Sequence, residues 1–141
     1  MSEMTPEQRR AFLAHGTRTG KLATTRADGR PHVVPIWFVL DGDDIILTTG
    51  ASSVKARNMR RDPRVSLAVD DQQPPYSFVM VEGTATLAED APDLLAWATR
   101  IGARYMGADR AEEYGRRNGV HGELLVRITP SKFTAQADIA D

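Results

Sequence analysis

The chain has 141 residues, no cysteine and a net charge of −1 from 18 basic and 19 acidic side chains. This length suits one domain, 1–141, with a continuous core. The lack of cysteine excludes disulfides, thiolate zinc sites, iron–sulfur clusters and cysteine nucleophiles. A nearly neutral chain has no overall field that attracts nucleic acid, so we expect no nucleic-acid partner.

The first residues, MSEMTPEQRR, are polar and acidic, whereas a signal peptide begins with a basic segment and an apolar run. A membrane helix needs about 20 apolar residues, and the sequence has no such stretch. We therefore expect a cytoplasmic protein with no membrane partner.

The chain opens with helix signals. Thr5 is a suitable N-cap, Pro6 suits the first helical position, and Gln8 completes a capping box. These residues predict a helix over about 5–15 that stops at Gly16.

Apolar segments and turn residues then alternate. The pattern predicts strands over 21–26, 31–40 and 44–49, and two tight hairpins that join them into a three-stranded meander. Pro35 cannot donate a hydrogen bond to a central sheet, so its strand is expected to lie at an edge, a bulge or a ligand-facing break.

The segment TTGASSVKARNMRRDP, residues 48–63, runs from a strand through a hydroxyl-rich turn into a short cationic helix. The start of a helix offers unpaired N–H groups and the positive end of the dipole, which together favour an anion. Lys55 and Asn58 share one face of this helix, and the opposite face carries three arginines, either solvated or facing a ligand: Arg57, Arg60 and Arg61. The sequence therefore predicts a phosphate site here.

The second half of the chain continues the mixed pattern. Strands are predicted over 64–70, over 76–87 with a bulge at Glu82-Gly83, and over 123–136 with a break at Pro130. Helices are predicted over 91–106, with Asp90 as cap, and over 109–118, with Glu112 in a capping box. Six or seven short strands with flanking helices predict an α+β, mainly β fold, an antiparallel barrel over about 20–136.

Other chemistries lack their motifs. The three histidines, His15, His32 and His121, have no second ligand at metal-binding spacing, so no metal site is expected. The sequence contains no nucleophile elbow, Walker A motif or GxGxxG motif.

Several segments together resemble the deazaflavin-dependent branch of the pyridoxamine phosphate oxidase-like split-barrel superfamily. They are LATTRADGRPHVVPIWFVLDGDDIILTTG, KARNMRRDPRVSLAVDD, PPYSFVMVEGTATL and RITPSKFTA, and they span about Gly20 to Ala135. An Arg-x-x-x-Leu-Leu-Lys type motif, by which pyridoxamine phosphate oxidases hold FMN, is absent. The resemblance therefore implies a coenzyme F420-dependent oxidoreductase that transfers a hydride to or from a small organic substrate.

The resemblance also implies a homodimer with cofactor sites at the interface and assigns roles by position. Lys55 would meet the cofactor phosphate, assisted by Thr49, Ser53 and Asn58, and the arginines would face the cofactor tail. The ring would lie against Val34, Pro35, Ile36 and Trp37. Tyr76 and Phe78 would reach the ring of the other subunit or would be plain core aromatics, and Tyr76 and His32 are weak candidates for a proton donor.

Two alternatives stay open at this point. One is an FMN-dependent oxidoreductase of the same fold, and the other is a carrier or sensor that binds a deazaflavin or tetrapyrrole without turnover.

Overall fold

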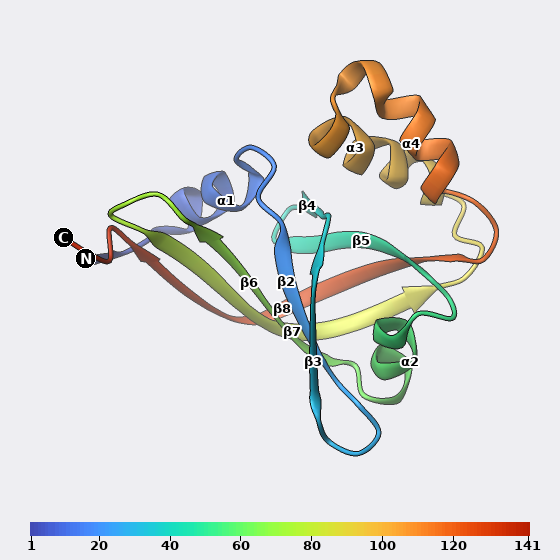
Figure 1. Ribbon diagram of the computed structural model, residues 1–141, viewed down its shortest axis with the longest axis horizontal. Helices are drawn as coiled ribbons and strands as arrows, with labels where there is room; N and C mark the ends of the chain where they lie inside the picture. Colours follow the sequence, from blue (N-terminus) through green and yellow to red (C-terminus); the bar gives the residue numbers. More distant parts are fainter.

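The computed structural model describes residues 1–141 as an antiparallel sheet with short flanking helices (Figure 1). The elements in chain order are β1 (Ser2–Glu3), α1 (Pro6–Ala14), β2 (Gly20–Thr25), β3 (Pro31–Ile36), β4 (Val39–Asp41), β5 (Asp44–Gly50), α2 (Val54–Arg61), β6 (Arg64–Asp71), β7 (Ser77–Ala88), α3 (Leu94–Met106), the 3-10 turn η1 (Ala108–Arg110), α4 (Ala111–Asn118) and β8 (Glu123–Ala137). The predicted α+β, mainly β class is confirmed, with eight strands in place of six or seven.

The sheet is a split barrel. Its strands follow the order β3-β2-β6-β7-β8-β5-β4, with β1 added to β8, and every pair is antiparallel. The two end strands, β3 and β4, are consecutive in the chain but do not pair with each other. The barrel is therefore open between them.

The predicted three-stranded meander is wrong, because residues 31–40 form two strands. The strand is interrupted at Trp37 and Phe38. There the Phe38 N–H donates to the Tyr105 hydroxyl at 3.2 Å instead of forming a hydrogen bond to a neighbouring strand. β3 pairs with β2, and β4 pairs with β5 at the other end of the sheet order. Pro35 lies opposite Lys21 on β3, an edge strand, as its missing donor predicts.

Local signals set the first two helices. The Thr5 hydroxyl accepts from the Gln8 N–H at 3.1 Å, and the Gln8 side chain accepts from the Thr5 N–H at 2.9 Å, which confirms the capping box. α2 follows Ser53, whose hydroxyl accepts from the Ala56 N–H at 3.1 Å. α3, the longest helix, has 13 residues, and no helix is both long and apolar enough to cross a membrane.

Two predicted helix starts are wrong. Asp90 has a φ of 50°, which an N-cap does not adopt, and α3 begins after Asp93. The Asp93 carboxylate accepts from the Trp97 ring N–H at 3.1 Å instead of capping the backbone. The second helix begins at Ala111 without the Glu112 capping box, because a 3-10 turn occupies the residues before it.

The long strands β7 and β8 pair around a bulge. Glu82 pairs with Lys132 and Gly83 pairs with Pro130, so Ser131 is the extra residue. The bulge predicted at Glu82-Gly83 is confirmed. The break predicted at Pro130 is wrong, because the irregularity lets the proline stay within a continuous β8.

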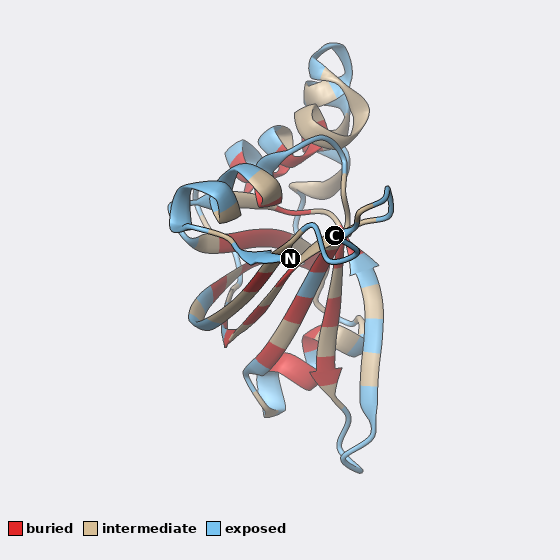
Figure 2. Ribbon diagram, turned by 90° about the vertical axis from the view of Figure 1, so that its left-hand side faces the viewer, coloured by how far each residue is buried: buried red, intermediate tan, exposed pale blue.

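Buried residues alternate along the strands (Figure 2). The main core fills the inner face of the sheet and includes Leu13 of α1 and Met59 of α2. A smaller cluster, on the other face of β5 and β8, holds α3 against the barrel; it consists of Ile46, Leu94, Trp97 and Leu125. In Figure 1, α3 and α4 accordingly stand together beside β4 and β5, away from α2.

Candidate functional site

A cavity of about 420 Å³ lies where the ends of β3 and β5, the start of α2 and the α3–α4 pair meet. Its wall is formed by Thr19, Pro35, Ile36, Trp37, Thr48, Thr49, Gly50, Lys55, Ile101, Asn118 and Glu123. Two segments that the sequence singled out, the strand end at Pro35 and the turn before α2, therefore open into one space.

One end of the cavity contains Lys55 and the turn that precedes α2. β5 brings Thr48 and Thr49 to the turn, and Lys55 lies in the first turn of α2. The hydroxyls of Thr49 and Ser53 are 2.9 Å apart, which ties the strand to the helix cap. The Lys55 ammonium and the positive end of the helix dipole both favour an anion here.

The other end of the cavity is apolar and is formed by the end of β3 and by Trp37, in the interruption between β3 and β4. Pro35 is exposed, Ile36 is buried, and the Trp37 ring stacks on Tyr105 with centroids 5.1 Å apart and planes 4° apart. Tyr114 of α4 approaches the same indole at 5.9 Å. The indole is thus fixed from the helix side while Trp37 lines the cavity.

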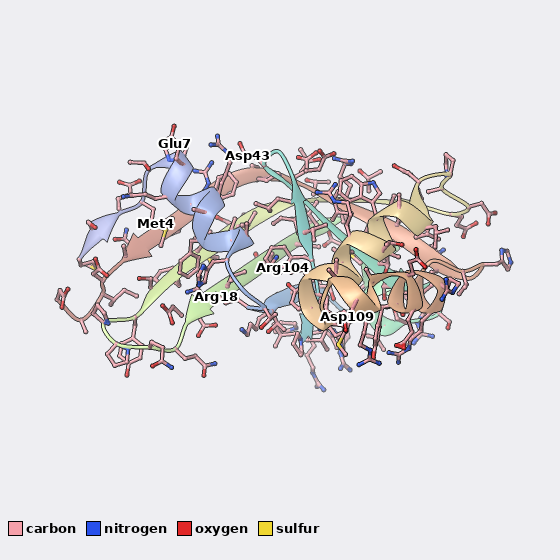
Figure 3. The ribbon with its side chains drawn as sticks, turned by 90° about the horizontal axis from the view of Figure 1, so that it is seen from above. Met4, Glu7, Arg18, Asp43, Arg104 and Asp109 are labelled. Atoms are coloured by element: carbon pink, nitrogen blue, oxygen red, sulfur yellow. The ribbon has the colours of Figure 1, made fainter.

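Tyr105 and Arg104 of α3 hold the segment between β3 and β4 in place. The Tyr105 hydroxyl donates to the Arg18 carbonyl at 2.9 Å, and burial raises the pKa of Tyr105, so the phenol stays neutral. Arg104 donates to the carbonyls of Phe38 at 2.8 Å and Leu13 at 2.7 Å, and burial lowers the pKa of Arg104. Figure 3 shows Arg104 between α3 and α1.

Glu123 is the acid of the cavity. It pairs with Gly50 across β5 and β8, which places it at the same end as Lys55. Burial raises the pKa of Glu123, and the nearby Lys55 charge opposes that rise. Sequence reasoning missed Glu123, along with Thr19, Ile101 and Asn118, because only long-range packing brings them to the wall.

Two predicted helpers of Lys55 have structural partners. Asn58 is 4% exposed, donates to the Thr24 hydroxyl at 3.0 Å and accepts from Arg61 at 3.0 Å. The Ser53 hydroxyl caps α2. Neither residue lines the cavity. Their hydrogen bonds instead connect α2 to β5, through Thr49, and to β2, through Thr24.

The three arginines of α2 differ in their contacts. Arg60 binds Glu89 at 2.8 Å and the Ala51 carbonyl at 3.2 Å. Arg61 donates to the Thr25 carbonyl at 2.6 Å and to Asn58. Arg57 is exposed and makes no side-chain hydrogen bond or ion pair within the chain.

The remaining predicted residues lie outside the cavity wall. Val34 packs against the main core, and His32 has a buried Nδ1 with no partner. Tyr76 is 46% exposed at a φ of 64°, and Phe78 is partly buried on β7. The roles of Tyr76 and Phe78 require a second subunit and stay a prediction.

Comparison with known proteins identifies the family of this chain. A profile of the family described as pyridoxamine 5'-phosphate oxidase matches residues 5–137. The chain belongs to this family.

Among solved structures, this family member is similar to a conserved hypothetical protein from Mycobacterium tuberculosis, with 31% identity over 96% of this chain and 86% of the other and a TM-score of 0.84. It is also similar to a protein named F420 reductase, with 28% identity, a TM-score of 0.69, and 88% and 94% of the two chains covered. A haem storage protein from Vibrio cholerae shares the fold at 20% identity, with a TM-score of 0.71 and 94% of each chain covered.

Proposed function

We propose that this protein is a coenzyme F420-dependent oxidoreductase that transfers a hydride between the deazaflavin and a small organic substrate. The observation that carries the proposal is the single cavity that joins the Lys55 end to the Pro35–Trp37 end. An anion seat next to an apolar wall suits a flat ring system that carries a phosphate. The likeness to the F420 reductase supports a deazaflavin over FMN, which the same seat would also hold.

In this proposal, the two ends of the cavity bind different parts of the cofactor. Lys55 binds the phosphate, and Thr49 adds a hydroxyl beside it. Pro35, Ile36 and Trp37 bound the ring on the β3 side and exclude water from it. Arg57, whose guanidinium has no partner in the chain, faces the anionic tail. This last contact is exposed, so it weakens with added salt.

The bound deazaflavin supplies the hydride, so the protein has to position and shield the reacting carbon rather than provide a nucleophile. The Tyr105 stack and the Arg104 hydrogen bonds keep Trp37 and Phe38 fixed, which preserves the shape of the ring end. Such preorganisation lowers the cost of aligning substrate and cofactor.

The proposal includes a homodimer. Large apolar side chains are exposed on the barrel: Val33 is 64% exposed on the edge strand β3, and Tyr76 is 46% exposed. In a dimer that covers them, Tyr76 and Phe78 of one protomer approach the cavity of its partner. Light scattering after gel filtration tests this, since a monomeric mass at micromolar concentration would contradict it.

A melting-temperature screen tests the cofactor. Ligands that bind the native state raise the melting temperature by mass action, so coenzyme F420 should give the largest shift among F420, FMN, FAD and haem. Reductase assays with reduced F420 then follow across a panel of small acceptors. A larger shift with FMN, or with haem and no turnover, would replace the proposal by the corresponding alternative.

Lys55→Ala tests the phosphate seat. Loss of the ammonium removes a charge-assisted contact of about 1.5 to 3 kcal/mol, so F420 affinity should fall roughly ten- to hundredfold. Lys132→Ala is a matched control, because Lys132 is 70% exposed, lies 4.0 Å from Glu82 and does not line the cavity. Equal affinity in Lys55→Ala and the parent would refute the assignment.

A further inference from the structure

The cavity contains one cation and one anion of its own. Of the side chains in its wall, only Lys55 and Glu123 carry a charge. Glu123 pairs with Gly50 at the end of β5, and α2 begins at Val54, so both charges belong to the same end. A carboxylate at this place is unexpected for a seat that accepts a phosphate, because like charges repel.

Glu123 and Lys55 do not form a direct ion pair. The ammonium acts on the carboxylate through space, and Glu123 is partly buried. An anion that binds Lys55 therefore enters next to an acid that no cation neutralises by contact.

The other charges around Glu123 already have partners. Glu123 also borders a smaller cavity of about 170 Å³ that includes Glu89, Asp90 and His121. Glu89 binds Arg60 at 2.8 Å, and Asp90 lies 3.3 Å from the His121 ring. Glu123 is thus an acid without an ion-pair partner beside Lys55, and its negative charge opposes an arriving anion.

We propose that Glu123 couples the binding of an anion at Lys55 to proton uptake by its own carboxylate. The coupling rests on the proposed phosphate seat and extends it: the seat accepts its ligand best when Glu123 is a neutral carboxylic acid. The neutral acid also has an O–H that can donate to the anion, whereas the carboxylate can only accept.

The sign of the pH dependence follows from linkage. A bound anion raises the pKa of Glu123 further above the value that burial already favours, so the complex holds a proton that the free protein releases. Between these two pKa values, affinity falls as pH rises. For two charges several ångströms apart near a protein surface, the loss is on the order of tenfold.

Calorimetry with the full chain tests the coupling. Titrations between pH 5 and 8, in two buffers of different ionisation enthalpy, measure the protons taken up per anion. The probes are coenzyme F420 and sulfate, and sulfate keeps its charge across this range. We expect the parent to take up about half a proton at the optimum pH and to lose about tenfold in affinity by pH 8, because a tenfold loss corresponds to a pKa difference of about one unit between the free and the bound protein.

Glu123→Gln keeps the shape of the side chain and removes its titration. This variant should take up no proton with sulfate and should bind both probes more tightly than the parent at pH 8. The ratio of parent to variant affinity cancels any ionisation of F420 itself. His121→Asn removes the neighbouring imidazole, and this variant should retain the uptake.

The outcomes separate the two proposals. If sulfate binds with proton uptake and F420 does not bind, the F420 assignment is wrong and the coupling stands. If F420 binds with the same pH dependence in the parent and Glu123→Gln, the coupling is wrong and the F420 assignment stands. If neither probe binds, both are overturned.

Discussion

The Tyr105 hydroxyl offers a sharp test of how the ring end of the cavity is held. Tyr105→Phe keeps the ring that stacks on Trp37 and removes only the oxygen. That oxygen accepts from the Phe38 N–H at 3.2 Å and donates to the Arg18 carbonyl at 2.9 Å. We expect the substitution to leave the Phe38 N–H without a partner at the break between β3 and β4.

The size of the effect follows from these contacts. Each hydrogen bond contributes about 0.5 to 1.5 kcal/mol, and an unsatisfied buried donor costs about 1 to 3 kcal/mol, so the free energy of unfolding should fall by roughly 1 to 3 kcal/mol. At a urea slope of about 2 kcal/mol per molar, the unfolding midpoint should drop by about 0.5 to 1.5 M. F420 affinity should fall with it, because Trp37 lines the cavity.

Tyr114→Phe is the matched control. Tyr114 also contacts Trp37, but its hydroxyl accepts only an exposed hydrogen bond from Arg110 at 3.3 Å. The free energy of unfolding of this variant should stay within about 0.5 kcal/mol of that of the parent. If Tyr105→Phe unfolds at the same urea concentration as Tyr114→Phe, the hydroxyl does not hold the break and the reasoning is refuted.

Three further predictions concern stability and titration. In Arg64→Ala, the pKa of Asp62 should rise from about 2 toward 3.8, because the hydrogen bonds from Arg64 are the main cause of the low value. The Asp62–Arg64 pair stabilises the native state above pH 3.8, and this contribution is lost as the pH falls toward 2. NMR titration of the carboxyl group measures the pKa. Gly83→Ala should lower stability by roughly 1 to 3 kcal/mol, since its Cβ would lie 2.6 Å from the Thr129 carbonyl oxygen; an unchanged urea midpoint would contradict this. Thr5→Ala removes the α1 cap and should cost about 1 kcal/mol in the same assay, whereas Thr5→Ser should cost little.

Sequence reasoning succeeded where short-range chemistry decides the structure. The capping box at Thr5 and the turn into α2 depend on residues three or four apart, and both are read directly from the chain. The edge position of Pro35 follows from its missing N–H. The same local logic predicted the short helix that carries Lys55, and Lys55 lines the cavity; its role toward a phosphate stays a prediction.

It failed where distant residues decide. The segment 31–40 looks like one strand, and only Tyr105 and Arg104, more than 60 positions later, divide it. Glu123 carries no local signal either, because its place in the cavity results from its pairing with Gly50. Asn58 was misjudged for the same reason: the helical face is correct, but Thr24 from β2 occupies its amide.

The construction of the cavity has a consequence for how such proteins diversify. The proposed anion seat belongs to β5 and α2, whereas Ile101 and Asn118 come from the α3–α4 hairpin, which leaves the barrel after β7 and returns at β8. Under the proposed function, exchange of this helical hairpin would alter which molecules meet the cofactor and would leave the turn that carries Lys55 unchanged. Grafting the hairpin of one relative onto the barrel of another offers a route to new reactivity.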